Sequence, residues 1–403
     1  MVYDSLDTRW QQMQHVVFAG VLPLTDIGSD LSVIYGIFAD YTADSGAHWF
    51  GYCSIAALAV PTGARLVGVL LIDGDEAYRP GGSVALGALL NLSQLHPVYN
   101  VWYDIVKMGK KGDGSTLAMM FELGGESCFQ TLIHMAFLLS PFKWRQWHAG
   151  GGMDTGSIVI FASLAVSLAS IANGALNVCM TGGGTEPGVS ELFTSSWVRK
   201  VIFRLYFLCG ALLSLGAYAA FWASFGAWTW AVLLPAMVLV RPLAAHACGI
   251  NDEDEGLGKT MLLSLLFGPL WLFVDYPAVL VDMTTEGKTA LGVLLCGVLS
   301  AAEAWLMIAL CVGVPSSNLR NTALYYPNTA AAASITNATN ASITNATDGV
   351  VAPLDTLLAN GLLGFAAVLT VLKVLFGFVV VRHWKYPGLA SLLCCRPETL
   401  PQL

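Results

Sequence analysis

The stretch FELGGESCFQTLIH, residues 121–134, places Glu122 and Glu126 four residues apart inside an apolar segment. On an α-helix this spacing turns one carboxylate only about 40° from the other, so both face the same side. Gln130 and His134 continue the four-residue spacing. The pattern predicts a helix with a polar track of about 18 Å along one side.

The composition around this stretch is that of a membrane protein. Of the 403 residues, 56% are hydrophobic and 11% are charged, whereas a soluble domain carries about 25% charged residues. Lipid cannot hydrogen-bond an exposed backbone, so helices of roughly 20 apolar residues are the expected spanning elements. The sequence therefore predicts an all-α, polytopic membrane helical bundle. Ten apolar segments are candidates, at about 14–38, 48–72, 83–106, 116–139, 156–180, 198–222, 226–246, 260–281, 289–312 and 353–381.

The placement of polar and basic residues predicts the membrane topology of these segments. The run SITNATNASITNAT carries glycosylation sequons at Asn337, Asn340 and Asn345, which favours a non-cytosolic loop. The basic runs KMGKKG (107–112) and KWRQW (143–147) both stay cytosolic if segments 83–106 and 116–139 dip in and return, as the positive-inside rule favours. We therefore expect eight spanning helices plus two re-entrant helices, with ten full spans as the alternative.

The chain is expected to divide into five parts along this topology. The first residues are acidic and polar, so the first apolar segment is not expected to be a cleaved signal peptide. Both termini should be cytosolic, and Cys394 and Cys395 just after the last span are a candidate palmitoylation pair. The parts are a cytosolic segment (1–13), the helical membrane core (14–312), a glycosylated loop (313–352), a final transmembrane helix (353–381) and a cytosolic tail (382–403).

Charged residues within the apolar segments are the main functional signal. Asp26 and Asp30, in DIGSD, repeat the four-residue spacing of the glutamates. A charge at the bilayer centre costs about 2.5–3.5 kcal/mol unless it is paired, protonated or hydrated. One explanation is structural: arginines neutralise carboxylates and lock helices together, or the carboxylates are protonated in a dry interior. A wetted polar groove is the explanation that we favour. Further ionisable groups within the apolar segments are Arg65, Arg204, Asp275 and Glu303, of which Arg65, Arg204 and Glu303 join the expected headgroup pathway.

Motifs of covalent chemistry are not recognisable. The nine cysteines include no C-x-x-C pair and no Cys/His cluster at metal spacing, which argues against a metal site. The GLGKT run (256–260) lacks the first glycine of a phosphate-binding loop and has no preceding strand. We expect no cofactor and no enzymatic activity.

Five pieces of the sequence, in order, resemble the XK-related family. They are DIGSDL (26–31), LLNLSQLHPVY (89–99), FELGGESCFQTLIH (121–134), the long segment from WVRKVIF to FGAW (197–228) and AAEAWL (301–306). The acidic helix is similar to the family's E-x-x-x-E-S-x-P-Q run, with Phe129 standing where proline is usual. The resemblance implies eight spans with two re-entrant helices, and phospholipid scrambling at the plasma membrane.

The residues and the resemblance together suggest an ATP-independent lipid scramblase. The carboxylates would hold headgroup ammonium groups, and Arg65 and Arg204 would contact phosphate. The family also implies a single-span glycoprotein or a cytosolic lipid-transfer protein as partner, and no nucleic acid. The tail after Val381 contains no Asp, so caspase activation there is not expected. The alternatives are a transporter or channel coupled to a cation or proton, and a non-catalytic membrane scaffold.

Overall fold

A computed structural model gives the fold of most of the predicted membrane core. The structure describes residue 6 and residues 8–41, 46–71, 80–109, 122–140, 143, 154–181, 197–226, 228–240, 242–243, 287–313 and 351–383. Within these ranges every regular element is a helix, as the sequence predicted.

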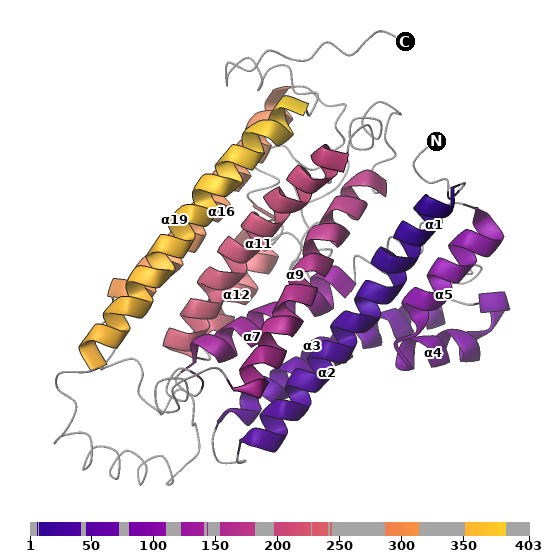
Figure 1. The fold of residues 1–403 in the computed structure, drawn as a ribbon, viewed down its shortest axis with the longest axis horizontal. Helices are drawn as coiled ribbons and strands as arrows, with labels where there is room; N and C mark the ends of the chain where they lie inside the picture. Colours follow the sequence, from indigo (N-terminus) through magenta and orange to yellow (C-terminus); the bar gives the residue numbers. More distant parts are fainter. Residues whose placement is uncertain are drawn as a thin grey trace.

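The helices form a bundle of long, roughly parallel rods (Figure 1). In chain order they are α1 (Arg9–His15), η1 (Val16–Val21), α2 (Leu22–Asp40), α3 (His48–Leu71), η2 (Pro80–Gly82), α4 (Val84–Leu92), α5 (His96–Tyr103), η3 (Asp104–Met108), η4 (Glu122–Ser127), α7 (Cys128–Leu139), α9 (Thr155–Thr181), α11 (Trp197–Phe225), α12 (Trp228–Pro235), η5 (Ala236–Val240), α16 (Gly287–Gly313) and α19 (Val351–His383).

The first three elements form one continuous helix, Arg9–Asp40. Its middle widens into the π-helical turn η1 just before Pro23. Proline has no backbone N–H and its ring crowds the preceding turn, so a local widening relieves the conflict without breaking the helix. Arg9 and Asp40 therefore mark opposite ends of the bundle, which we call the Arg9 end and the Asp40 end.

Contacts along the long helices fix their directions. In α9, Ser163 and Ser167 contact Asp30 and Asp26, so α9 runs antiparallel to α2. The helix α11 starts at the Arg9 end, where Arg204 contacts Asn173. The helix α16 runs parallel to α11, with Glu303 beside Tyr218 and Cys311 beside Ser224. The helix α19 runs antiparallel, with Lys373 beside Tyr206 and Phe365 beside Gly216.

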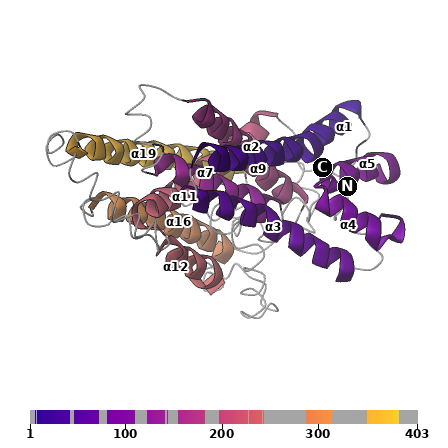
Figure 2. The ribbon, with the colours of Figure 1, turned by 90° about the horizontal axis from the view of Figure 1, so that it is seen from below.

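A short helical hairpin, α4–α5, lies at one edge of the bundle, beside α3 and η1 and away from α16 and α19 (Figures 1 and 2). Its two helices have 9 and 8 residues, too few to cross a hydrocarbon core. Gln94 at its tip has φ 57°, a left-handed conformation that costs a non-glycine residue about 1 kcal/mol or more. The hairpin lies within the segment 83–106, for which the sequence predicted a re-entrant helix.

The second expected re-entrant segment, 116–139, does not return to the end from which it started. Gly109 accepts a hydrogen bond from the backbone of Leu6, 2.8 Å away, at the Arg9 end. Lys143 lies over the ring of Tyr41, next to Asp40. The chain between 109 and 143 therefore passes from one end to the other, and the two basic runs around it begin at opposite ends. The hairpin turn expected there is replaced by packing of α7 along α11 and α9.

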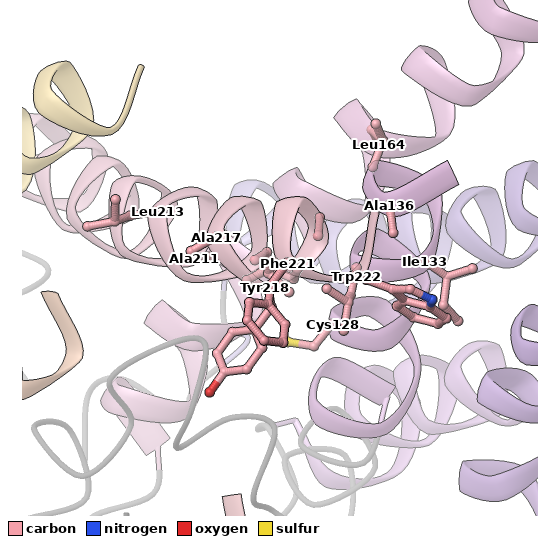
Figure 3. Packing of buried hydrophobic residues seen from close by; sticks show 14 of the residues in the cluster. Cys128, Ile133, Ala136, Leu164, Ala211, Leu213, Ala217, Tyr218, Phe221 and Trp222 are labelled. Atoms are coloured by element: carbon pink, nitrogen blue, oxygen red, sulfur yellow. The ribbon is translucent and has the colours of Figure 1, made fainter. Parts of the chain in front are cut away.

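Helix α11 forms the centre of the core. It packs against α7, α9, α16 and α19, and small residues such as Ala211, Gly216 and Ala217 let these neighbours approach closely. Figure 3 shows Tyr218, Phe221 and Trp222 filling the space beside Cys128 of α7. Trp222 also stacks on Phe50 of α3, with ring centroids 5.6 Å apart. The bundle is thus held by an apolar core that surrounds one helix.

The outer surface suits a membrane. Within the described ranges, four helical stretches are long and apolar enough to cross one: Arg9–Asp40, His48–Leu70, Thr155–Leu176 and Lys200–Phe225. Exposed aliphatic residues such as Val60 on α3 and Val371 on α19 face outward, although such residues are normally buried in soluble proteins. Exposed Trp10 and Tyr35 lie roughly 37 Å apart along the first helix, and aromatic residues concentrate at membrane interfaces.

Candidate functional site

A cluster of polar side chains lies where α2, α3, η4, α7 and α9 meet. Figure 1 shows that α2, α3, α7 and α9 are neighbours in the bundle. The residues differ in kind but are all at most 2% exposed. They are Asp26, Asp30, Arg65, Glu126, Ser127, Gln130, His134, Ser163 and Ser167. We call this group the polar cluster. It contains six of the nine residues that the sequence proposed for a headgroup pathway.

Asp26 is fully hydrogen-bonded within the cluster. Ser127 donates to its Oδ2 atom at 2.8 Å, and Ser167 donates to its Oδ1 atom at 2.5 Å. The two hydroxyls come from η4 and from α9, so this carboxylate joins three separate elements. Hydrogen bonds to a buried carboxylate compensate for much of its lost hydration.

Asp30, one turn further along α2, is only partly satisfied. Ser163 donates to its Oδ1 atom at 2.7 Å, and Nδ1 of His134 lies 3.8 Å from the same oxygen. The Oδ2 atom of Asp30 and the Nε2 atom of His134 are buried and have no hydrogen-bond partner among the described residues. An acid and an imidazole are therefore enclosed together with one unmet hydrogen-bonding atom on each.

Arg65 and Glu126 form the least satisfied part of the cluster. Nη2 of Arg65 lies 3.7 Å from Oε2 of Glu126, which is too long for a hydrogen bond. Neither carboxylate oxygen of Glu126 accepts a hydrogen bond from the described residues, and Nε of Arg65 has no acceptor there. Nη2 of Arg65 instead donates to Oε1 of Gln94 at 2.9 Å. The tip of the α4–α5 hairpin thus reaches the ion pair.

A close backbone approach sets the position of Glu126. A Cβ atom added to Gly125 would lie 2.7 Å from Cγ of Pro61 in α3, so a glycine is required there. The surrounding turn, η4, is π-helical, and such turns are frequent at functional sites. Pro61 is followed by Thr62, whose hydroxyl accepts a hydrogen bond from Gln94 at 2.6 Å. Glu126, Arg65 and the hairpin tip are therefore positioned together.

The polar track of the opening stretch exists but faces inward. Gln130 donates to the carbonyl of Ser54 in α3 at 2.8 Å, and His134 faces α2 and α9. The sequence predicted a wetted groove open to lipid headgroups, and this conformation instead encloses the carboxylates. Serine hydroxyls replace water as donors, and Gly125 lets η4 close against α3. Glu122 lies in η4, and its side chain lies outside the described part.

Arg204 and Glu303 lie away from the polar cluster. Nε and Nη2 of Arg204 both donate to Oδ1 of Asn173, at 3.2 and 2.9 Å. Glu303 of α16 accepts a hydrogen bond from the hydroxyl of Tyr218. The proposed modification sites lie outside the described residues: Asn337, Asn340, Asn345, Cys394 and Cys395.

An ion pair outside the membrane-length helices closes the Asp40 end. Nζ of Lys143 lies 3.0 Å from Oδ2 of Asp154, and the other carboxylate oxygen, Oδ1, accepts hydrogen bonds from the backbone N–H and the hydroxyl of Ser157. Partial burial by itself raises the pKa of the Asp154 carboxyl, but the hydrogen bonds from Ser157 and Lys143 outweigh it and lower the pKa to about 2. Asp154 is therefore charged at neutral pH and links the start of α9 to Lys143, four residues after the end of α7.

Several residues of the site were missed in the sequence. Ser163 and Ser167 have the spacing of a helix-packing face and were not included among the pathway residues. Gln94 lies in LLNLSQLHPVY, which entered the sequence analysis only because it resembles the XK-related family. The acceptors of the serines are distant in sequence, so only the fold reveals them. The four-residue spacing of Ser163 and Ser167, matching that of Asp26 and Asp30, is the signal that pairs them.

No group of three metal-ligating side chains occurs among the described residues. The cluster combines carboxylates, one guanidinium and hydroxyls, which suits binding of a zwitterionic or cationic group. Compared with protein-family models and with curated proteins, this chain has no match.

Proposed function

We propose that this chain is an ATP-independent phospholipid scramblase similar to the XK-related family, and that its polar path is closed in the present conformation. The observation that supports this most is the Arg65–Glu126 pair, which is buried yet not hydrogen-bonded across its 3.7 Å separation. A pair that served only to join helices would be expected to form direct hydrogen bonds, because burial of unsatisfied charges is costly.

A phospholipid headgroup offers both partners that this pair lacks. Its ammonium group can approach Glu126, and its phosphate can bind the guanidinium of Arg65. Neither contact needs to be tight, because a strongly bound headgroup would not move on. Such exchange requires no covalent step and no ATP, and phospholipids are the only ligands that the proposal needs.

The α4–α5 hairpin is the element that we propose to open the path. Its tip is attached to α3 by hydrogen bonds from Arg65 and to Thr62, both through the side chain of Gln94. Two hydrogen bonds of this kind contribute about 1–3 kcal/mol together, which thermal motion can overcome on the timescale of helix movements. Outward movement of the tip would give headgroups access to Arg65.

The helix directions support a specific topology of eight spans. Gly109 and Lys143 lie at opposite ends of the bundle, and so do Phe225 and Gly287. Eight spans, with Leu6 and His383 on one side, fit these directions if the chain crosses once between Gly109 and Lys143 and once between Phe225 and Gly287.

The same directions support a cytosolic Arg9 end. The sequon-bearing loop follows Gly313 and precedes Val351, both at the opposite end, as expected of a non-cytosolic glycosylated loop. Basic residues should accumulate on the cytosolic side. Those at the Arg9 end are Arg9, Lys107, Arg199, Lys200, Lys288 and Arg382, whereas Lys143 lies at the Asp40 end. The plasma membrane is the proposed location, and a single-span glycoprotein or a cytosolic lipid-transfer protein the proposed partner.

Dithionite quenching of fluorescent lipids in liposomes that contain the purified chain tests the proposal. We expect quenching beyond the outer-leaflet half for wild type, and a rate at least about tenfold lower for Glu126→Gln, as loss of one charge-assisted contact implies. Asp40→Asn, which removes an exposed carboxylate at the Asp40 end, is the matched control. Wild-type protein that leaves inner-leaflet lipid unquenched would rule the proposal out.

The Asp30–His134 pair favours a second candidate function. Both side chains are buried, and each has one polar atom without a partner among the described residues, a combination typical of intramembrane proton carriers. A transporter or channel coupled to protons is therefore the alternative. It predicts acidification of a pH-sensitive dye inside the same liposomes under a proton gradient, without exchange of fluorescent lipid between leaflets.

A further inference from the structure

We propose that Lys200 and Arg204, together with Asn173 and Phe18, form a binding site for the phosphate of an anionic phospholipid in the leaflet at the Arg9 end. The site is separate from the polar cluster. Asn173 lies six residues beyond Ser167 along α9, about 9 Å closer to the Arg9 end. This proposal rests on the proposed function and extends it by a lipid that stays bound instead of crossing the membrane. The test of the site does not depend on scrambling.

The guanidinium of Arg204 is held in a fixed orientation. Nε and Nη2 donate to Oδ1 of the buried Asn173, and the guanidinium carbon lies 5.2 Å from the centre of the Phe18 ring in η1. A guanidinium has five N–H donors, so three remain after the two bonds to Asn173. These remaining donors present the two-pronged geometry that matches a phosphate.

The positive charge at this site has no partner in the described part of the chain. No carboxylate there lies within 4.0 Å of Arg204 or Lys200. Lys200 stands one helical turn before Arg204 on α11, and like charges at this spacing repel. Two neighbouring cations that no acid among the described residues neutralises attract an anion, and their half-buried position strengthens the attraction relative to bulk water.

The depth of the two side chains identifies a membrane lipid as the source of the anion. Helix α11 has 29 residues, or about 43 Å, and exceeds a 30 Å hydrocarbon core by about 7 Å at each end. Lys200 and Arg204 begin roughly 4 and 10 Å from its start, on either side of the hydrocarbon boundary. Long basic side chains at this depth reach the phosphate level of the bilayer.

A defined binding site should select one type of lipid, whereas two basic side chains at the membrane surface would attract any phosphate headgroup. Phosphatidylcholine carries its own cation beside the phosphate, whereas phosphatidylserine has net negative charge. Two uncompensated cations therefore favour phosphatidylserine, the type of lipid that is enriched in a cytosolic leaflet. The orientation imposed by Asn173 adds a geometric requirement that simple attraction of charge does not have.

Native mass spectrometry of the full-length chain in detergent, titrated with phosphatidylserine or phosphatidylcholine, tests the site. We expect wild type to retain phosphatidylserine preferentially and Arg204→Gln to weaken its binding about tenfold, the effect of one charge-assisted hydrogen-bonded contact. Lys107→Gln, which removes an exposed charge at the same end, should change nothing. Equal retention of the two lipids by wild type, or equal phosphatidylserine binding by wild type and Arg204→Gln, overturns the proposal.

Two further measurements complete the design. Asn173→Leu keeps both charges but removes the orienting acceptor, so we expect weaker binding of phosphatidylserine; an unchanged affinity shows attraction of charge alone and overturns the site. Lys200→Gln decides the case if Arg204→Gln does not fold, since it should also weaken binding. Displacement of phosphatidylserine by millimolar inorganic phosphate would identify the free anion as ligand and overturn the assignment to a lipid.

Discussion

Asp26 and Glu126 are two buried carboxylates of the same cluster, but their surroundings differ. Asp26 accepts hydrogen bonds from two serines on two other elements, while Glu126 faces one arginine across 3.7 Å and accepts no hydrogen bond from the described residues. Hydrogen-bonded burial stabilises helix contacts, and unsatisfied burial costs free energy. The comparison indicates a structural role for Asp26, and Glu126 is the carboxylate to which we assign the proposed headgroup contact.

Replacement of Arg65 should have the largest effect on stability. Arg65→Met leaves Glu126 buried without the one cation that lies near it among the described residues, and breaking such a pair costs about 3–5 kcal/mol. We expect a large decrease in the thermal unfolding temperature of the purified protein. The double variant Arg65→Met/Glu126→Gln removes both charges and should recover most of the loss. A single variant as stable as wild type would contradict the view that the pair is enclosed.

Gly125→Ala should destabilise the junction on which both carboxylates depend. The added methyl group would meet Pro61 at 2.7 Å, and overpacking of this kind costs about 2 kcal/mol. Gly28→Ala on α2 is the matched control, since nothing lies within 4 Å of its added methyl. Thermal unfolding of both variants measures the difference, and equal stability would mean that η4 and α3 are not packed closely.

Asp26→Asn tests most directly whether Asp26 and Glu126 have different roles. The amide can accept only one of the two serine hydrogen bonds, so we expect a loss of about 1 kcal/mol in the free energy of unfolding. Lipid flipping per folded molecule should stay at the wild-type rate, in contrast to Glu126→Gln. A variant of normal stability that no longer flips lipid would reverse the roles assigned to the two residues.

The Lys143–Asp154 pair gives the smallest effect, because Asp154 is partly exposed. Its pKa of about 2 lies below the ordinary value near 3.9. The stabilisation is therefore complete above about pH 4 and is lost as the pH falls toward 2. Thermal unfolding of wild type and Lys143→Met across this window should converge at low pH. A constant difference between them would show that the pair contributes through packing alone.

The sequence allowed correct prediction of the features that depend on short-range patterns. Apolar length and the scarcity of charges predicted helices and a membrane, since each helix satisfies its own backbone in lipid. The spacing of Glu126, Gln130 and His134 predicted that they share one side of a helix. The expectation that segment 116–139 turns back was not met, because α7 packs along α11 and α9 and Lys143 lies over Tyr41 at the Asp40 end.

Which side of that helix faces outward could not be predicted from spacing. A polar stripe has the same residue spacing in the sequence whether it lines a groove or contacts serines on a neighbouring helix. The hydroxyl donors to Asp26 lie 101 and 141 residues away along the chain, so only packing reveals them. For the same reason Gln94 could not be recognised as a neighbour of Arg65.

The sequence by itself determined that the chain is helical, that it suits a membrane and that ionisable groups lie at mid-depth, because composition and helical period act locally. Only the tertiary structure decided that the acidic residues are enclosed, that Asp26 is satisfied while Glu126 is not, and that Arg204 stands apart beside Asn173. These outcomes depend on which helices meet and in which direction they run, and contacts between segments far apart in the chain fix both.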